Sequence, residues 1–318
     1  MASSEIMSVS EVRDIAQKVL TELRKLVVGK GEVMQNIFIA LLADGHVLLE
    51  GVPGVAKTFM ANAFADVLGC SFKRIQFTPD MLPADVTGTN IFDSQNATFK
   101  LKKGPIFGNI VLADEINRAP PKTQAALLEC MQERQVTLEG ETHKLDRPFL
   151  VLATQNPVEL EGTYPLPEAQ VDRFLFKLNV GYPTDQEEVE IIKRKHSPVD
   201  VKLQAITNPE LLVRMQNAVR HIHVDKAIME FIRDIVVRTR KDPQILLGGS
   251  PRASIVLLTC AKARAAILGR DYITPDDVKS LTLHGLYHRL ILKPEAELGG
   301  VSVPRLVFNL LEEMRAPI

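Results

Sequence analysis

Apolar residues three or four positions apart open the chain and predict an amphipathic helix. This first stripe comprises Val12, Ile15, Val19, Leu23 and Leu26, and its spacing matches one face of a helix. Ser8 and Glu11 precede the stripe at capping-box spacing, which sets the helix start. After the glycine of "VVGK", a second helical stripe is predicted through Met34, Ile37, Phe38 and Leu41.

Strand-like and helical patterns then alternate. The runs "HVLLEG", "FGNIVLADEINRA" and "RPFLVLATQNP" each read as an apolar strand with a polar end, and a helical stretch covers about residues 123–133. Apolar strands alternating with helices predict an α/β fold, a parallel sheet covered on both faces with its ligand beyond the carboxyl ends of the strands. The alternation in "RQVTLEGETHKL" predicts a hairpin that turns at Glu139-Gly140-Glu141.

Strand signals fade after "NVGYPTD". The segments "KAIMEFIRDIVVRTR", "PRASIVLLTCAKARAAIL" and "TPDDVKSLTLHGLYHRL" have the helical period. We therefore expect an α/β domain over residues 1–190 and a smaller all-helical domain over residues 191–318, joined across roughly residues 181–198.

Composition agrees with two domains and narrows the partners. The 318 residues are 46% hydrophobic, enough for two cores, and 38 basic against 39 acidic side chains give a net charge of -1. No overall positive field draws the chain to nucleic acid, so no nucleic-acid partner is expected. The opening "MASSEIMSVSEVRD" does not resemble a secretory signal, and no apolar run reaches bilayer length. We expect a cytoplasmic location without membrane insertion.

The cysteines and histidines offer no metal pattern. Cys70, Cys130 and Cys260 lack paired spacing, which argues against a zinc cluster or a disulfide framework and indicates ordinary reduced thiols. His284 and His288 lie four positions apart, but no glutamate of the metalloprotease type stands between them. We expect these histidines on a helix surface or in the core.

The stretch "GVPGVAKTFM" has the order strand, glycine loop, helix that a phosphate-binding loop requires. Backbone N–H groups of such a loop converge on phosphate oxygens at a helix N-terminus. Gly51 and Gly54 are expected to supply unusual backbone angles, Lys57 to reach the outer phosphates and Thr58 to bind Mg2+. Ala56 replaces the last glycine of the usual pattern, and we expect right-handed angles there, at which a methyl group costs little.

Two further predicted strands end in polar residues at the edge of the sheet where the glycine loop begins. "NIVLADE" ends in Asp114, the expected magnesium partner of Thr58, and Glu115, the expected base that polarises water. The alternative is two acids that only solvate a strand end. "ATQNP" places Asn156 beside them, either to position water or the γ-phosphate, or simply to form the turn before Pro157.

With these elements together, the chain resembles an AAA+ ATPase of the MoxR family. The resemblance rests on "VVGKGEVMQNIFIALLADGHVLLEGVPGVAKT", "FTPDMLPADVTGTNIF", "KGPIFGNIVLADEINRAPPKTQAALLECMQERQVTL", "ATQNPVELEGTYPLPEAQVDRF" and "GGSPRA", and it runs through almost the whole chain. It implies a P-loop AAA+ sheet domain, a helical lid, and ATP with Mg2+ as ligands.

The resemblance also implies roles for single residues. The loop corresponds to the Walker A element, whose residues here are Gly51, Val52, Pro53, Gly54, Val55, Ala56, Lys57, Thr58 and Phe59. Asp114 and Glu115 correspond to Walker B and Asn156 to sensor 1. The run "VVG", Val27 to Gly29, corresponds to the adenine pocket, with Val28 and Gly29 as the expected cofactor-binding residues, and Lys30 replaces the glutamine common after that glycine.

Two arginines complete the implied site. Arg173 in "VDRF" matches the arginine finger that reaches a neighbouring subunit's nucleotide, and Arg252 in "SPRA" matches sensor 2 on the lid. A guanidinium can stabilise charge on the γ-phosphoryl oxygens, so assembly would switch the reaction on. A surface or interface salt bridge is the alternative for Arg173, and Arg118 is the rival finger. Pro251 is placed to begin a helix whose first turn faces the nucleotide cleft between the domains, so Arg252 is expected to roof the site formed by Lys57, Thr58, Asp114 and Glu115 of its own chain.

The resemblance implies an ATP hydrolase that forms a ring, expected to be a homo-hexamer, with a chaperone-like role and often von Willebrand factor A domain partners. The hairpin near Gly140 and the insertion "LPADVTGTNIF" are candidates for pore-facing surfaces or for packing elements. Two alternatives remain: an ATP-binding regulatory scaffold with little turnover, which does not need Glu115, and a DNA-associated motor, which the near-neutral charge and 5% aromatic content disfavour. The sequence contains no Asn-Lys-x-Asp run, the pattern that binds guanine, so GTP is not the expected nucleotide.

Overall fold

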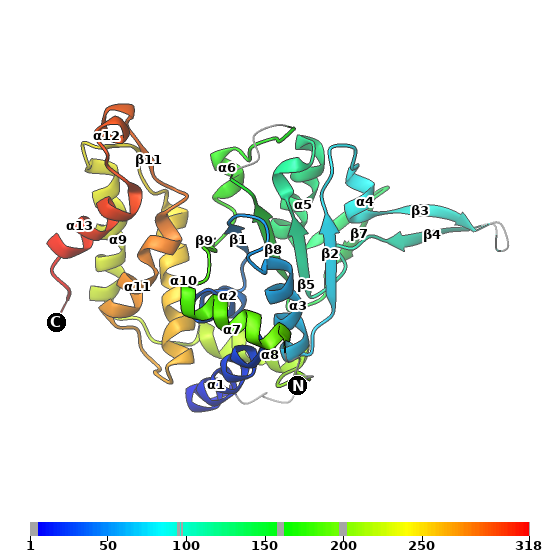
Figure 1. Cartoon of the computed structure of the whole chain (residues 1–318), viewed down its shortest axis with the longest axis horizontal. Coiled ribbons are helices and arrows are strands. Elements are labelled where there is room, and N and C mark those ends of the chain that lie inside the picture. Colours follow the sequence, from blue (N-terminus) through cyan, green and yellow to red (C-terminus); the bar gives the residue numbers. More distant parts are fainter. Residues whose placement is uncertain (1–5, 94–95, 97, 158–161, 197–201, 318) are drawn as a thin grey trace.

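The first part of the chain forms a five-stranded sheet with flanking helices. The part from residue 209 onward forms a second group of helices, which we call the lid (Figure 1). The structure is a computed structural model, and it describes residues 6–93, 96, 98–157, 162–196 and 202–317. The strand order is β2-β5-β8-β1-β9, with every neighbouring pair parallel. These strands are β1 (Val47–Glu50), β2 (Phe72–Gln76), β5 (Ile110–Asp114), β8 (Leu150–Gln155) and β9 (Phe176–Asn179).

The other elements surround this sheet or form the lid. The first group comprises α1 (Val9–Leu26), α2 (Gly31–Leu42), α3 (Lys57–Leu68), α4 (Pro83–Thr87), the 3-10 turn η1 (Ile116–Arg118), α5 (Pro121–Glu133), α6 (Glu168–Val171) and α7 (Asp185–His196). The second comprises α8 (Pro209–Arg220), α9 (Lys226–Lys241), β10 (Ile245–Leu247), α10 (Pro251–Ile267), α11 (Pro275–Leu286), β11 (Ile291–Leu292), α12 (Pro294–Leu298) and α13 (Val303–Glu313).

The predicted fold class, a parallel sheet with flanking helices followed by a helical lid, is confirmed. The lid also contains a short antiparallel pair, β10 with β11, that the helical pattern did not predict. Helix α7 runs through residues 190 and 191 without a break. The division into residues 1–190 and 191–318 therefore stays a prediction.

The predicted start of α1 is confirmed by its capping box. The Ser8 backbone N–H donates to Glu11 Oε2 at 2.9 Å, and the Glu11 backbone N–H donates to Ser8 Oγ at 3.3 Å. These two bonds satisfy N–H groups that the first helical turn leaves without partners.

Alternation along each strand divides the interior into two cores. Val47 and Leu49 of β1 face a core shared with α1, α2 and α3, whereas Leu48 faces a second core shared with α5. All three side chains are fully buried. Successive strand residues point to opposite faces, so a sheet with helices on both sides requires such apolar runs.

Two hairpins leave the sheet domain. The predicted hairpin is β6 (Gln135–Leu138) with β7 (Glu141–Lys144), and its turn residues Glu139 and Gly140 both have positive φ, 49° and 88°. The second, β3 (Gly88–Asp93) with β4 (Thr98–Lys103), was not predicted as a hairpin and projects far from the sheet (Figure 1). Asn90 Nδ2 donates to Glu139 Oε2 at 3.0 Å, which joins the two hairpins.

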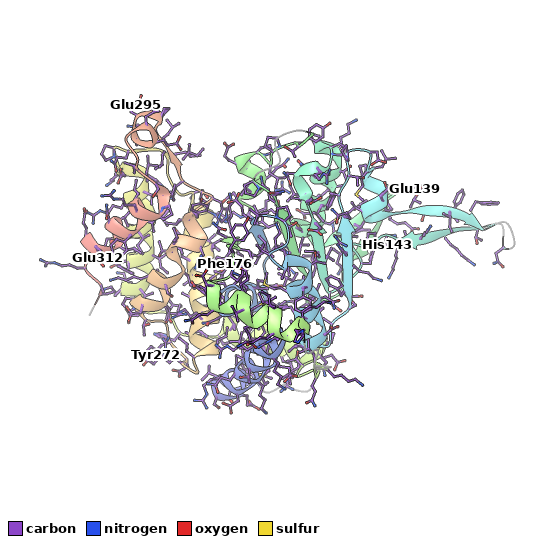
Figure 2. The ribbon with its side chains drawn as sticks, viewed as in Figure 1. Glu139, His143, Phe176, Tyr272, Glu295 and Glu312 are labelled. Atoms are coloured by element: carbon purple, nitrogen blue, oxygen red, sulfur yellow. The ribbon has the colours of Figure 1, made fainter. Side chains whose placement is uncertain are left out.

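The lid packs on β9 through aromatic and polar contacts. The rings of Phe176 and His284 meet edge to face with centroids 6.2 Å apart. Phe176 lies at the junction between the two groups of elements (Figure 2). His284 Nε2 also lies 3.3 Å from Glu32 Oε1, and His288 Nε2 lies 3.1 Å from the Phe174 carbonyl oxygen. Both histidines thus contribute to packing between lid and sheet domain.

The three cysteines are free thiols, as the sequence indicated. Burial raises the pKa of Cys70, Cys130 and Cys260 to about 12, so these thiols stay protonated at neutral pH.

His46, which directly precedes β1, connects this strand to β8 and α5. Its Nδ1 accepts the Val151 backbone N–H at 3.0 Å, and its Nε2 donates to the Met131 carbonyl oxygen at 3.0 Å. Burial lowers the pKa of His46 to about 3, and the positive charge of Arg134 adds to this shift. The ring is therefore neutral in the folded chain, because a proton on Nδ1 would remove the acceptor for Val151.

This buried histidine makes stability depend on pH. The folded pKa lies below the unfolded value of about 6.5, so the stabilisation is fully present above pH 6.5 and is lost as the pH falls toward 3. Between pH 7 and pH 5 we expect the wild type to lose about 2 kcal/mol more unfolding free energy than His46→Gln, which has no ionisable ring. Urea unfolding of both proteins at both pH values measures this; equal losses would contradict it.

Candidate active site

The glycine loop follows β1 directly and leads into α3. Lys57 is the first residue of α3, and its Nζ donates to the Gly51 carbonyl oxygen at 2.5 Å. Gly54 has φ of 84°, as predicted, but Gly51 does not have positive φ. A Cβ on Gly51 would instead lie 2.5 Å from the Val180 carbonyl oxygen. Close approach to the segment after β9, rather than an unusual angle, therefore requires glycine at position 51.

The expectation for Ala56 was wrong. Ala56 is the N-cap of α3 with φ of 65° and ψ of 23°, which is the left-handed region. The right-handed angles expected there begin one residue later, at Lys57. A side chain in the left-handed region costs roughly 1–2 kcal/mol, since its Cβ approaches the following carbonyl oxygen. The loop therefore retains backbone strain at this position.

Asp114 meets the loop from the neighbouring strand end. Thr58 Oγ1 donates to Asp114 Oδ2 at 3.3 Å, and Thr154 Oγ1 donates to Asp114 Oδ1 at 2.6 Å. Arg74 Nη2 also reaches Oδ2, at 2.7 Å. The predicted pairing of Thr58 with Asp114 is thus present, and a cationic group already lies at the same carboxylate oxygen.

Glu115 follows Asp114 in a strained conformation, with φ of 57°. Its backbone N–H donates to Thr154 Oγ1 at 2.8 Å. Its Oε2 accepts hydrogen bonds from Gln76 Nε2 at 2.9 Å and from Arg118 Nη1 at 3.0 Å. The carboxylate is held beside Asp114 by its own chain.

Three polar residues of this network were missed in the sequence: Arg74, Gln76 and Thr154. Arg74 and Gln76 share one face of β2, because they are two residues apart, and Gln76 pairs in register with Asp114. The sequence carried no clear signal for them, because "FKRIQ" has its apolar residues, Phe72 and Ile75, three positions apart and so lacks the alternation of a half-buried strand.

Asn156 is buried and lies one residue beyond β8, which separates β5 from β1 in the sheet. The Gln155 residue before it pairs in register with Glu50, the last residue of β1. Asn156 therefore stands at the same edge of the sheet as the loop and the two acids.

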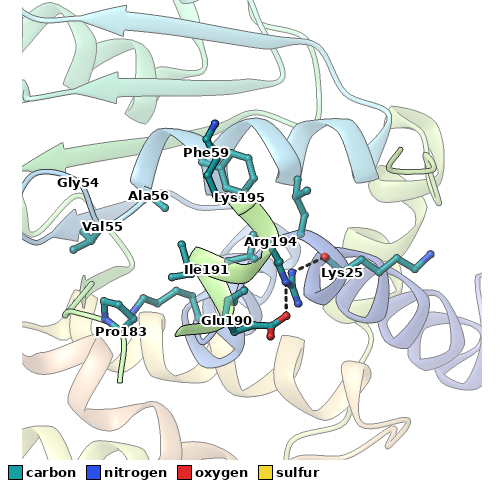
Figure 3. Close-up of a pocket in the computed structure, with 14 residues that line it drawn as sticks. Lys25, Gly54, Val55, Ala56, Phe59, Pro183, Glu190, Ile191, Arg194 and Lys195 are labelled. Atoms are coloured by element: carbon teal, nitrogen blue, oxygen red, sulfur yellow. Dashed lines mark hydrogen bonds and ion pairs between the residues drawn. The ribbon is translucent and has the colours of Figure 1, made fainter. Parts of the chain in front are cut away.

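A cavity of about 690 Å³ opens beside the loop (Figure 3). Val28, Ala56 and Phe59 line it from the sheet domain, and Ile191 lines it from α7. The wall formed by α7 is fastened by Arg194, whose Nη1 donates to the Lys25 carbonyl oxygen at 2.8 Å. The predicted adenine-side residue and the loop thus share one cavity.

The neighbours of Val28 shape this cavity indirectly. Gly29 has φ of 72°, and the Glu187 carboxylate fills the space where its Cβ would be. Lys30, the departure from the family pattern, donates from Nζ to the carbonyl oxygens of Gly181 at 2.9 Å and Tyr182 at 3.2 Å. Its ammonium group therefore holds the connector that follows β9.

The residues present fit a magnesium nucleotide. The cavity volume falls within the roughly 300–1,000 Å³ of small-molecule sites. Thr58 and Asp114 offer the hard oxygen ligands that Mg2+ prefers. Lys57 and the start of α3 supply the positive side for phosphate groups.

The two predicted arginines lie elsewhere. Arg173 precedes β9, and its Nη1 donates to the Leu128 carbonyl oxygen at 3.0 Å. Arg252 is the second residue of α10, and its Nε lies 4.0 Å from Asp172 Oδ2. The amino end of β9 pairs with the amino end of β1. The loop begins at the other end of β1, about 10 Å further along the strand. The structure does not bring either arginine to the loop of its own chain.

Together, the parallel sheet, glycine loop and acid pair define a P-loop ATPase of the AAA class. Residues 46–176 match the family described as "ATPase family associated with various cellular activities (AAA)", and residues 237–307 match the "AAA lid domain" family. A crystal structure of a proposed ATPase from Cytophaga hutchinsonii superposes with a TM-score of 0.91 and 41% identity, covering 98% of this chain and 97% of that one.

Two relatives refine this class. "Chaperone MoxR1" of Mycobacterium tuberculosis is 45% identical over 92% of this chain and 80% of its own length. "Uncharacterized protein YeaC" of Bacillus subtilis is 47% identical over 97% of both chains. The chain belongs to the MoxR family of AAA+ ATPases, as the resemblance implied, and it is an ATP hydrolase. No helix in the described part of the chain has the length and apolarity to span a bilayer.

The strain at Ala56 leads to a stability prediction. Ala56→Gly removes the Cβ, so we expect the unfolding free energy to rise by about 0.5–1 kcal/mol after the extra flexibility of the unfolded chain is subtracted. Ala125→Gly, at an exposed right-handed position of α5, is the matched control and should lower it by about 1 kcal/mol. Chemical denaturation measures both; a loss in Ala56→Gly would contradict the assignment of strain.

Proposed function

We propose that this chain forms a ring, a homo-hexamer, in which Mg2+-dependent ATP hydrolysis drives the remodelling or maturation of other proteins. The observation that carries the proposal is the division of the site: the loop and acids lie at one edge of the sheet, whereas Arg173 and Arg252 lie toward the other. A head-to-tail ring brings these two edges of neighbouring subunits together.

Each residue at the loop edge then has a role. Thr58 and Asp114 hold Mg2+, and Lys57 binds the outer phosphate groups. Glu115 orients and polarises the attacking water, and Asn156 positions that water or the γ-phosphate. Bound Mg2+ supplies neutralisation of phosphate charge. For Glu115 to act on water, its carboxylate must exchange the bonds from Gln76 and Arg118 for one to water.

The neighbouring subunit supplies the arginines. Arg173 acts as the finger on the γ-phosphoryl group of the next subunit, and Arg252 acts beside it as the lid sensor. Arg118, the rival finger, pairs at 3.0 Å with Glu115 of its own chain, which favours Arg173. Asp172 lies next to Arg173 in sequence, and its Oδ2 lies 4.0 Å from Arg252 Nε, so both arginines lie near the turn that precedes β9.

The remodelling role rests on the family. One relative is named a chaperone, and the resemblance implies von Willebrand factor A domain proteins as partners. The β3–β4 hairpin exposes Phe92 and Phe99, whose ring centroids lie 5.3 Å apart. In a ring, this exposed aromatic pair would bind apolar side chains of a client protein in the central pore. The cytoplasmic location is part of this proposal.

Glu115→Gln distinguishes an ATPase motor from an ATP-binding scaffold. We expect phosphate release to fall at least about 100-fold, because the amide cannot accept a proton, while ATP binding stays within about threefold of wild type. Phosphate release and equilibrium binding of a fluorescent ATP analogue measure the two quantities. Unchanged phosphate release would favour the scaffold.

Arg173→Ala tests the shared site. Wild-type phosphate release per subunit should rise with protein concentration as rings form, and in Arg173→Ala it should stay at least about 1,000-fold lower, as is typical when a trans arginine is lost. Arg233→Ala removes an exposed arginine of α9, which pairs at 2.7 Å with Asp234 of the same helix, and is the control for charge alone. Activity that persists undiminished in dilute, monomeric protein would rule out the ring mechanism.

A further inference from the structure

Arg289 is a buried lid arginine that the site described above does not use. It lies between α11 and β11, and its side chain is 2% exposed. Burial lowers its pKa, and the Asp172 carboxylate opposes that shift. A guanidinium remains charged even so, so its burial requires partners for the charge and for every N–H group.

Those partners are concentrated on the segment that carries Arg173. Arg289 Nε donates to Asp172 Oδ1 at 2.6 Å, and Nη2 donates to the carbonyl oxygens of Asp172 at 2.9 Å and Phe174 at 2.7 Å. Nη1 donates to the carbonyl oxygens of Leu175 at 3.2 Å and Gly285 at 2.5 Å. Nη1 also lies 2.7 Å from His288 Nε2. Four of these six contacts are with residues 172–175.

The segment is also held by backbone bonds within the sheet domain. The N–H groups of residues 172–175 donate, in that order, to the carbonyl oxygens of Glu168, Gln170, Val171 and His46. Residues 172–175 form turns and bends between α6 and β9, so their carbonyl groups are not committed to a helix or strand. Arg173 therefore projects from a backbone whose N–H groups are held by the sheet domain, and whose neighbouring carbonyl groups, at Asp172, Phe174 and Leu175, are bonded by a side chain of the lid. Lysine could replace only part of these bonds, because it has three donors on one atom rather than five in a planar fork.

Asp172 connects this contact to the second arginine. Its Oδ1 accepts from Arg289, and its Oδ2 lies 4.0 Å from Arg252 Nε. One carboxylate thus faces two lid arginines, and it precedes Arg173 directly. A change in lid position would alter the arrangement of Arg173 and Arg252 together.

We propose that Arg289 is a positioning residue that sets the orientation in which Arg173 is presented to the neighbouring subunit, and so couples lid position to hydrolysis next door. This inference rests on the proposed trans role of Arg173. Arg289 touches no nucleotide of its own chain, since its contacts lie at the amino end of β9.

Mixing of inactive subunits tests this coupling. Arg289→Met should keep ATP affinity within about threefold and ring assembly unchanged, but lose at least about tenfold in phosphate release, because its own loop is intact and its finger is misplaced. Mixed with Glu115→Gln, whose finger is intact, activity should return to about a quarter of wild type, since random mixing joins an intact loop to an intact finger at about a quarter of interfaces.

A second mixture identifies the defect. Arg289→Met mixed with Arg173→Ala should stay inactive, because both subunits lack a working finger. Asp172→Asn, which removes the charge at Oδ1 and Oδ2, should follow the same pattern and serves where Arg289→Met does not fold. Arg289→Lys should retain an intermediate rate. The matched control is Arg270→Lys: Arg270 pairs with Asp277 at 2.7 Å within the lid, and its variant should retain wild-type activity.

The outcomes separate the two proposals. If Arg173→Ala and Glu115→Gln fail to complement each other, the trans arginine itself is refuted. If that pair complements but Arg289→Met and Asp172→Asn gain nothing with Glu115→Gln, or if Arg289→Met gains activity with Arg173→Ala, the positioning role of Arg289 is refuted. Weakened ATP binding in both Arg289→Met and Asp172→Asn would also refute it.

Discussion

Parallel pairing of β5, β8 and β1 is the constraint on which the site depends. Because the three strands run in one direction and in register, their carboxyl ends deliver the glycine loop, the acid pair and Asn156 to one edge. Thr154 fastens this edge by bonding both Asp114 Oδ1 and the Glu115 backbone N–H. The chemistry thus depends on strand direction first and on single side chains second.

Features with a local signature were predictable from the sequence. Apolar runs gave the three central strands, capping chemistry gave the start of α1, and the turn residues Glu139 and Gly140 gave one hairpin. The loop and the acids were found because their chemistry requires certain residues at fixed spacing. The edge strand β2 and the four-residue β9 were missed, since each contains basic or polar residues that interrupt the apolar pattern.

What the sequence could not predict depends on residues far apart in the chain. The left-handed angle at Ala56 follows from the path of the loop as a whole, and Arg74 reaches Asp114 only because β2 pairs with β5. The placement of Arg252 beside Asp172, away from its own loop, follows from how the lid docks on β9. Motifs identify which groups take part, whereas the docking of the lid decides where each group lies relative to the loop.

The wall of the cavity has a consequence for ligand exchange. Helix α7 has no buried residue, and it is held in part by polar bonds such as that from Arg194 to the Lys25 carbonyl oxygen. Elements with so little buried apolar surface open at low free energy. Opening of this single helix would therefore widen the cavity while leaving both cores intact.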